Sequence, residues 1–220
     1  MGNQTSRELD QARKYYREER IPKAALSVMD ADTERLTAEK FADRALQPGA
    51  VAPDFILPDA QGKLVWCHSL LRNGPAVVVF YRGGWCPYCN IHLRGFQRSL
   101  PELKALGAQI VAISPQVPDN SLSTQEKDEL EYPVLSDVGN KVAHKFGVAF
   151  RLSDPLLKLY ESFGHPLLEA NGKEGEFELP VPATFVIDTK GVIRRSHVDV
   201  DYTHRLDPED VIIAIKKLTN

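Results

Sequence analysis

Six consecutive apolar residues at positions 76–81, Ala-Val-Val-Val-Phe-Tyr, constrain the fold of this chain more than any other segment. Apolar and polar residues do not alternate within the run, which is typical of a strand buried on both faces of a parallel or mixed sheet. The run is far shorter than the roughly 20 apolar residues of a membrane-spanning helix. It therefore predicts a central strand whose sheet is covered by helices on both sides.

A helical pattern begins directly after this strand. Between residues 86 and 106, the apolar side chains Leu93, Phe96 and Leu100 recur on one helical face, and Pro101 is expected to kink the helix. Strand and helix patterns then alternate to the end of the chain, which predicts an α/β fold with a mixed central sheet flanked by helices. We expect strands at 55–57, 64–66, 109–114, 134–135, 184–188 and 192–198, and helices at 121–130, 140–146 and beyond Asp207.

Two segments lie outside this alternation. Residues 1–46 carry helical patterns, with Thr5 and Glu8 at the spacing of a capping box, and a Pro-Gly pair at 48–49 ends the region. We interpret 1–46 as an N-terminal helical extension that packs on the domain or on a partner subunit, so that a homodimer is compatible with the sequence. Residues 47–220 form the expected domain, and residues 151–180 form an insertion with a helix near 155–163.

Composition excludes several classes of protein. A 220-residue chain that is 43% hydrophobic can bury a full core, and its net charge of −3 provides no basic surface for nucleic acid. The first 20 residues alternate basic and acidic side chains without an apolar stretch, so we expect no signal peptide, no membrane association and a cytoplasmic location. Three cysteines in a chain of this length are too few for a secreted disulfide framework.

Two of the three cysteines form one short motif, Cys86-Pro87-Tyr88-Cys89, where the central strand gives way to a helix. Proline is favoured at the first helical position, which places Cys86 at the N-cap and Cys89 one turn into the helix. The positive end of the helix dipole there favours thiolate over thiol. Two sulfurs at this spacing can also close a disulfide, so one can attack a substrate while the other resolves the product.

Two other interpretations of the cysteines remain open from the residues alone. They could be structural buried thiols, although a pair at the end of a strand is an unusual place for them. They could also bind zinc, with His92 on the next turn and Cys67-His68 as further donors. A structural zinc site usually has a second ligand pair at a regular spacing, which Cys67-His68 does not provide, so redox chemistry without a cofactor is favoured.

The segment from Val78 to Cys89 resembles the active-site strand and helix start of the thioredoxin-like superfamily. From about Leu46 onward the chain resembles the peroxiredoxin branch of that superfamily, the AhpC/TSA family. The matching segments are Pro48-Gly49, Ala52-Pro53-Asp54-Phe55, Ser136-Asp137, Val142-Ala143, Phe146-Gly147-Val148, and Ala183 to Asp188 with Gly191. The resemblance implies a thioredoxin-like fold and a thiol peroxidase that reduces hydrogen peroxide or organic hydroperoxides and is recycled by a thioredoxin-type donor.

The chain departs from the peroxiredoxin pattern at three positions. When the family motif Pro-x-x-x-Thr-x-x-Cys is aligned with this chain, Arg82 replaces the proline and Cys86 replaces the threonine. Cys89 then occupies the position of the peroxidatic cysteine. Pro182 stands where the family has an arginine that polarises the peroxide, and it resembles instead the cis-proline of thioredoxins and disulfide reductases. From these positions we expect Arg82, Trp85 and Pro182 to contact substrate.

This mixture of features leaves two redox mechanisms with different nucleophiles. In the favoured one, a peroxidase, the Cys89 thiolate attacks the peroxide and Cys86 resolves the sulfenic acid. In the alternative, a thiol-disulfide oxidoreductase, Cys86 attacks a substrate disulfide and Cys89 releases it. The zinc-stabilised, non-enzymatic module is a second alternative. Cys67 is expected to be an inert buried thiol.

Overall fold

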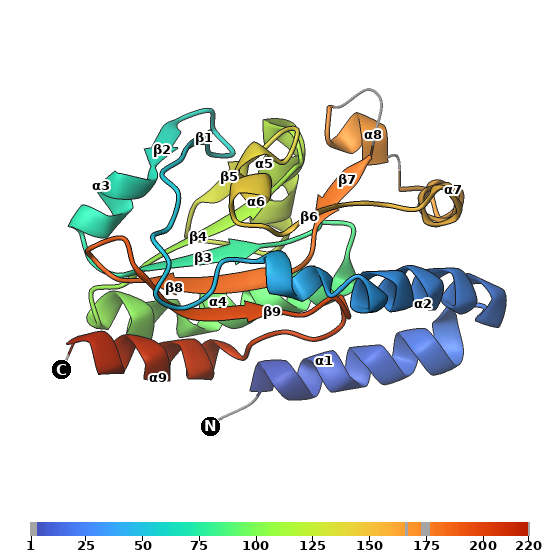
Figure 1. Ribbon diagram of the computed structural model, residues 1–220, viewed down its shortest axis with the longest axis horizontal. Coiled ribbons are helices and arrows are strands. Elements are labelled where there is room, and N and C mark those ends of the chain that lie inside the picture. The colour runs from blue at the N-terminus through green and yellow to red at the C-terminus, as the bar shows by residue number, and fades with distance from the viewer. Residues whose placement is uncertain (1–3, 166, 173–176, 220) are drawn as a thin grey trace.

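The computed structural model describes residues 4–165, 167–172 and 177–219 (Figure 1). Its central sheet has five strands in the order β5-β4-β3-β8-β9, with β3, β4 and β5 parallel and with β8 and β9 antiparallel to their neighbours. The strands of this sheet are β3 (Ala76–Phe80), β4 (Gln109–Ser114), β5 (Val134–Ser136), β8 (Ala183–Ile187) and β9 (Ile193–Val198). Two small antiparallel pairs join β1 (Ile56–Pro58) with β2 (Leu64–Trp66), and β6 (Ala149–Arg151) with β7 (Glu178–Pro180).

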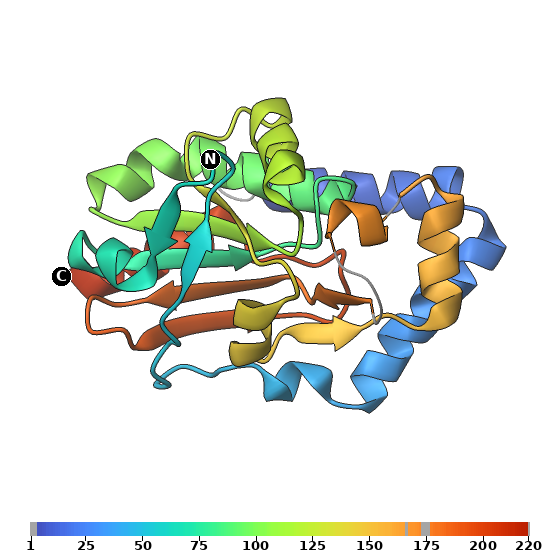
Figure 2. The same cartoon turned by 90° about the horizontal axis from the view of Figure 1, so that it is seen from above.

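Helices cover both faces of the sheet (Figures 1 and 2). They are α1 (Gln4–Lys14), α2 (Lys23–Ala38), α3 (Cys67–Arg72), α4 (Pro87–Ala105), α5 (Pro118–Lys127), α6 (Lys141–Lys145), α7 (Asp154–Ser162), α8 (Leu167–Ala170) and α9 (Pro208–Thr219). A π-helical turn, η1 (Tyr15–Arg20), extends α1, and a 3₁₀ turn, η2 (Phe41–Arg44), follows α2. Along the described chain, no helix is long and apolar enough to cross a membrane.

The predicted central strand is confirmed. Every residue of β3 is at most 1% exposed, and its side chains alternate between two cores. Val77 and Val79 pack with side chains of α4 and α9, whereas Val78 and Phe80 pack with Phe146 on the opposite face. A strand buried on both faces explains why the run lacks polar residues, and the expected α/β fold with a mixed sheet is confirmed with it.

The N-terminal helices pack on the domain at two places. Helix α1 lies along α4, and Leu9 belongs to the same core as Val77. Asp207 connects α1 to α9, because one carboxylate oxygen accepts hydrogen bonds from the Ser6 backbone N–H and hydroxyl (3.0 and 2.8 Å) while the other caps α9. Thr5 lies inside α1, where its hydroxyl accepts a hydrogen bond from Arg98 (3.2 Å). The capping role predicted for Thr5 is therefore wrong, since its side chain is a packing contact.

Helix α2 packs on the segment interpreted as an insertion. Met29, Leu36 and Phe41 form a third core with side chains from β6, α7 and β7. The predicted helix near 155–163 is confirmed as α7, and the segment 173–176 lies outside the described residues. The sequence did not reveal α3, whose first residue, Cys67, directly follows the strand predicted at 64–66. Helix α3 follows β2 directly, without the polar turn that usually separates two elements, so the sequence pattern did not indicate where the helix begins.

The close approach of α1 and α4 depends on Gly95. A Cβ at this position would lie 2.4 Å from the Thr5 hydroxyl oxygen and 2.8 Å from its methyl carbon. We expect Gly95→Ala to lower the free energy of unfolding by about 1–3 kcal/mol, the usual cost of overpacking, as measured by urea denaturation. Adding Thr5→Ala removes both clashing atoms and is expected to restore part of the loss. If the free energy of unfolding lost by the double variant equals the sum of the losses of the two single variants, this account is contradicted.

Candidate active site

The loop between β3 and α4 has no room for side chains at its two glycines. Gly83 has a φ of +150°, and a Cβ there would lie 2.4 Å from the Trp85 indole nitrogen. A Cβ on Gly84 would lie 2.3 Å from the Thr124 hydroxyl oxygen. The Gly84 N–H donates to Gln116 (2.8 Å), and its carbonyl accepts from the Asn90 amide (2.9 Å). Both backbone polar groups of Gly84 are thus held by side chains, which fixes the loop directly before Trp85 and the cysteines.

Cys86 and Cys89 occupy the positions predicted from Pro87. Cys86 is the N-cap of α4, Pro87 is its first residue, and Cys89 lies in the first turn. Both thiols are reduced and buried, at 1% and 0% exposure. The two sulfurs are hydrogen-bonded to each other, but only Cys86 borders the adjacent pocket. Cys89 lies behind Cys86, away from the pocket.

Two arginines bring positive charge to Cys89. One guanidinium nitrogen of Arg205 lies 3.5 Å from the Cys89 sulfur, and the backbone N–H of Arg82 also donates to that sulfur. Burial disfavours the thiolate, yet the hydrogen bond from Cys86 and the charges of Arg205 and Arg82 outweigh it and lower the pKa of Cys89 to about 5. Burial and the neighbouring Cys89 raise the pKa of Cys86. The pair therefore carries one negative charge, on Cys89, with Cys86 as the thiol that donates to it.

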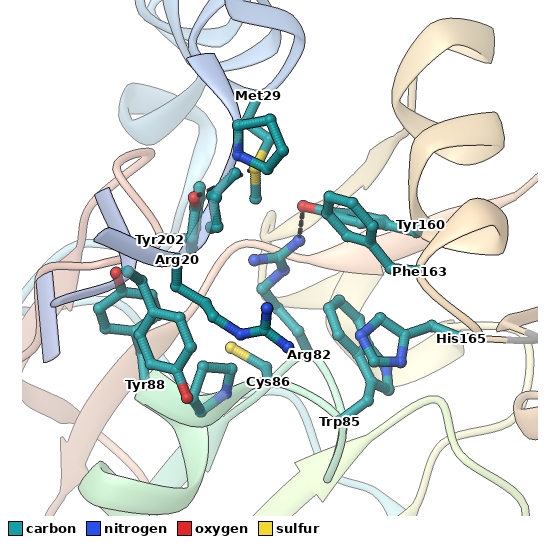
Figure 3. Close-up of a pocket in the computed structure, with 14 residues that line it drawn as sticks. Arg20, Met29, Arg82, Trp85, Cys86, Tyr88, Tyr160, Phe163, His165 and Tyr202 are labelled. Atoms are coloured by element: carbon teal, nitrogen blue, oxygen red, sulfur yellow. Dashed lines mark hydrogen bonds between the residues drawn. The ribbon is translucent and has the colours of Figure 1, made fainter. Parts of the chain in front are cut away.

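Arg82 is a buried cation surrounded by aromatic rings. It is 3% exposed, and its guanidinium carbon lies 4.8, 5.2 and 4.5 Å from the ring centres of Trp85, Tyr160 and Tyr202. It donates a hydrogen bond to the Tyr160 hydroxyl, drawn as a dashed line in Figure 3. Among the described residues no carboxylate pairs with it. A buried charge needs compensation, and the Cys89 thiolate provides the nearby anion.

His92 positions the loop that carries Arg205. Its ring lies one turn beyond Cys89 on α4, and Nε2 donates to the Leu206 carbonyl at 2.9 Å. Burial lowers the pKa of His92 to about 3, so the ring is neutral near pH 7. His92, considered above as a zinc ligand, is thus occupied by a backbone hydrogen bond. Within the described residues, no group of three His, Cys, Asp or Glu side chains is placed to hold a metal ion.

Cys67 lies away from this site. It belongs to the core on the opposite face of the sheet, is 2% exposed, and burial raises its pKa to about 11. A buried thiol with a raised pKa is a poor nucleophile.

A pocket of about 490 Å³ opens beside Cys86 (Figure 3). Arg82 and Trp85, both expected at the substrate site, line it. Pro182 does not: it borders a smaller cavity behind Arg82, with Tyr160 and Tyr202. No cis peptide bond occurs in the described chain, so the comparison of Pro182 with a cis-proline is wrong. The trans form of a peptide bond before proline is favoured by about 0.5–1 kcal/mol, and the sequence does not show which form the local packing selects.

Three residues of the site could not be identified from the sequence. Tyr160 comes from the insertion, and Tyr202 and Arg205 come from the loop before α9, more than 70 residues from the cysteines. None of them belongs to a motif. Only the fold brings this loop to the first turn of α4.

Together, these features define a class of protein. A parallel β3-β4-β5 core, antiparallel β8 and β9, and a cysteine with a lowered pKa in the first turn of the helix after β3 are the elements expected of a thiol peroxidase with the thioredoxin fold. The sequence profile of the AhpC/TSA family matches residues 48–196. The chain belongs to this family, as the resemblance of the segments from about Leu46 onward implied.

Individual relatives agree with this assignment. The chain is 28% identical to the chloroplastic peroxiredoxin Q of Triticum aestivum over 190 residues, which cover 86% of this chain and 74% of that protein. It is 30% identical to the chloroplastic peroxiredoxin Q of Populus jackii over 170 residues, covering 77% of this chain and 66% of that protein. The crystal structure of peroxidoxin BcpB from Mycobacterium tuberculosis superimposes with a TM-score of 0.62 at 23% identity, covering 79% and 98% of the two chains. The expected thioredoxin-like fold and thiol peroxidase class are confirmed.

Proposed function

We propose that this protein reduces peroxides with Cys89 as the attacking thiolate and Cys86 as the resolving thiol. The observation that carries the proposal is the position of Arg205, whose guanidinium lies 3.5 Å from the Cys89 sulfur. This arginine supplies the charge that the family arginine, replaced here by Pro182, would otherwise provide. Positive groups fixed beside a reacting sulfur favour the thiolate and also stabilise negative charge on a departing oxygen.

The protein is oxidised to a disulfide in two steps. The Cys89 thiolate attacks the terminal peroxide oxygen, so that an S–O bond forms and the O–O bond breaks. The departing alkoxide takes the proton of the Cys86 thiol and leaves as an alcohol, or as water when hydrogen peroxide is the substrate. The Cys86 thiolate then attacks the Cys89 sulfenic acid, a disulfide forms, and the released hydroxide takes a proton from solvent. The disulfide is returned to two thiols by a dithiol donor, for which we predict a thioredoxin-type protein.

The peroxide reaches Cys89 through the pocket beside Cys86. Because Cys86 borders the pocket and Cys89 lies behind it, rotation of the Cys86 side chain about its Cα–Cβ bond opens the path. Cys86 precedes the first helical residue, where its extended backbone (φ −89°, ψ 113°) leaves the side chain outside the packing constraints of the helix interior. The resolving thiol thus also controls access to the attacking one.

One observation favours a second function. Cys86, and not Cys89, faces the pocket, as the attacking cysteine of a thiol-disulfide oxidoreductase must. In that reaction Cys86 would attack a substrate disulfide and Cys89 would displace it. The charges around Cys89 argue for the peroxidase, because they stabilise the thiolate on the inner sulfur.

Two assays on the purified protein separate these functions. With thioredoxin, thioredoxin reductase and NADPH, the peroxidase is expected to consume hydrogen peroxide in proportion to enzyme, while insulin disulfides remain largely intact in the turbidity assay without peroxide. Rapid insulin reduction with negligible peroxide consumption would instead establish the oxidoreductase. The cytoplasmic location and the homodimer stay predictions from the sequence.

A further inference from the structure

We propose that the pocket beside Cys86 selects organic hydroperoxides that carry a carboxylate on an apolar or aromatic body, and that Arg20 binds the carboxylate. The proposal rests on the peroxidase function above and names its substrate class. It is carried by the size of the pocket, its aromatic walls, and the balance of charge around it.

The pocket is much larger than hydrogen peroxide requires. Its volume of about 490 Å³ falls in the range of roughly 300–1,000 Å³ that is typical of sites for organic ligands. Water could fill such a space, but the walls are mainly apolar and offer water few partners. The space therefore fits a substrate with an organic body.

Aromatic side chains form two opposing walls. On one side, the ring of Trp85 lies 5.2 Å from that of Tyr160 and 5.4 Å from that of His165. On the other, the ring of Tyr88 lies 5.9 Å from that of Tyr16. Figure 3 shows Trp85 and His165 on one side of Cys86 and Tyr88 on the other. A flat or elongated apolar group between them would contact ring faces on both sides.

The charge of the pocket selects an anion. Two arginines, Arg20 and Arg82, are among the 14 residues that line it, and no described lining residue is acidic. Burial and the charge of Arg82 lower the pKa of His165, so this ring is neutral near pH 7 and adds no positive charge to that of the two arginines.

Of the two arginines that line the pocket, Arg20 is the one available to bind a carboxylate. Arg82 is held among three aromatic rings and compensates the Cys89 thiolate. Arg20 is exposed and, in the described part of the chain, makes no hydrogen bond or ion pair; Figure 3 shows its side chain directed into the pocket. A guanidinium can bind a carboxylate through two parallel hydrogen bonds. Arg20 is therefore the anchor that the geometry offers.

The segment that carries Arg20 is fixed in place. Arg20 ends η1, and the next residue, Ile21, donates its backbone N–H to the Tyr16 carbonyl (2.9 Å). Arg17 in the same turn makes two hydrogen bonds to Asp30 of α2, both 2.8 Å long. Since the family profile begins at residue 48, this wall of the pocket comes from a segment outside the family match. Selection of the carboxylate is thus a property of the N-terminal extension of this chain.

A matched pair of hydroperoxides tests the proposal. We expect the full-length enzyme to use para-carboxy cumene hydroperoxide with a kcat/KM about five- to tenfold above that for its methyl ester, mainly through a lower KM. In Arg20→Gln the ratio of the two kcat/KM values is expected to fall close to one, and Arg20→Lys should retain part of it. Lys14→Gln, an equivalent loss of charge on α1 outside the pocket, should leave the ratio unchanged.

The outcomes distinguish this proposal from the peroxidase function. Equal use of acid and ester by the wild type, or a ratio that survives Arg20→Gln, would overturn the selection by Arg20. Failure to consume hydrogen peroxide and both organic hydroperoxides would overturn the peroxidase assignment instead. Calorimetric binding of para-isopropylbenzoate, which has no O–O bond, is independent of turnover: weaker binding by Arg20→Gln than by the wild type supports the site, and equal binding contradicts it.

Discussion

Replacing Cys89 with serine is expected to lower peroxide turnover by about a thousandfold or more, because it removes the only thiolate that the two arginines stabilise. Cys86→Ser should behave differently. Its serine hydroxyl can still donate to Cys89, so the enzyme should reduce one equivalent of peroxide and then stop as the Cys89 sulfenic acid. Trapping with dimedone followed by mass spectrometry locates the modified sulfur.

Cys67→Ala provides the control for this pair of variants. The side chain is small and buried on the other face of the sheet, so the change should leave turnover and the position of trapping as in the wild type. Sulfenic acid trapped on Cys86 in the Cys89→Ser protein, with none on Cys89 in the Cys86→Ser protein, would show that the order of attack is the reverse of the one proposed.

Replacing Arg205 with methionine is expected to cost about a hundred- to a thousandfold in the rate of peroxide reduction, the usual effect of removing one donor at a developing charge. The same change should raise the pKa of Cys89, since Arg205 is one of the groups that lower it. Stopped-flow measurement of the first turnover gives the rate, and the ultraviolet absorbance of the thiolate gives the pKa.

The direction of the pH effect follows from the protonation state that reacts. In Cys86→Ser, which has a single thiol in the site, the first-turnover rate should fall as pH decreases through the pKa of Cys89, because protonation converts the reactive thiolate to thiol. Adding Arg205→Met should move this midpoint to higher pH. Arg194→Met, which removes an arginine paired with Asp188 at the β8–β9 turn, should not move it. An unchanged midpoint in the Arg205 variant would exclude its electrostatic role.

The sequence predicted the elements whose conformation depends on residues close to one another in the chain. The apolar run 76–81 defined β3, and Pro87 placed Cys86 at the N-cap and Cys89 in the first turn. These features depend on local propensity and on burial, which a sequence records directly. Arg82 follows the end of β3 and lines the pocket, and its contact with substrate stays a prediction.

The charges and walls of the site could not be predicted because they come from distant segments. Arg205 lies 116 positions after Cys89 and reaches it only because β8, β9 and the following loop return to the start of α4. Tyr160 and Tyr202 likewise meet at Arg82 through tertiary packing. For Pro182 the sequence suggested the wrong analogy, since its position in the chain resembles that of a cis-proline whereas its peptide bond is trans.

The hydrogen bond from His92 to the Leu206 carbonyl has a mechanical consequence. It attaches the segment bearing Arg205, which follows β9, to α4, the helix that also carries Cys89. The position of the guanidinium is therefore coupled to the helix that carries the sulfur. The same segment is also bound to the N-terminal extension, because Asp207 accepts two hydrogen bonds from Ser6 of α1, and its Tyr202 lines the pocket. The charge beside the sulfur and the shape of the pocket therefore depend on one segment.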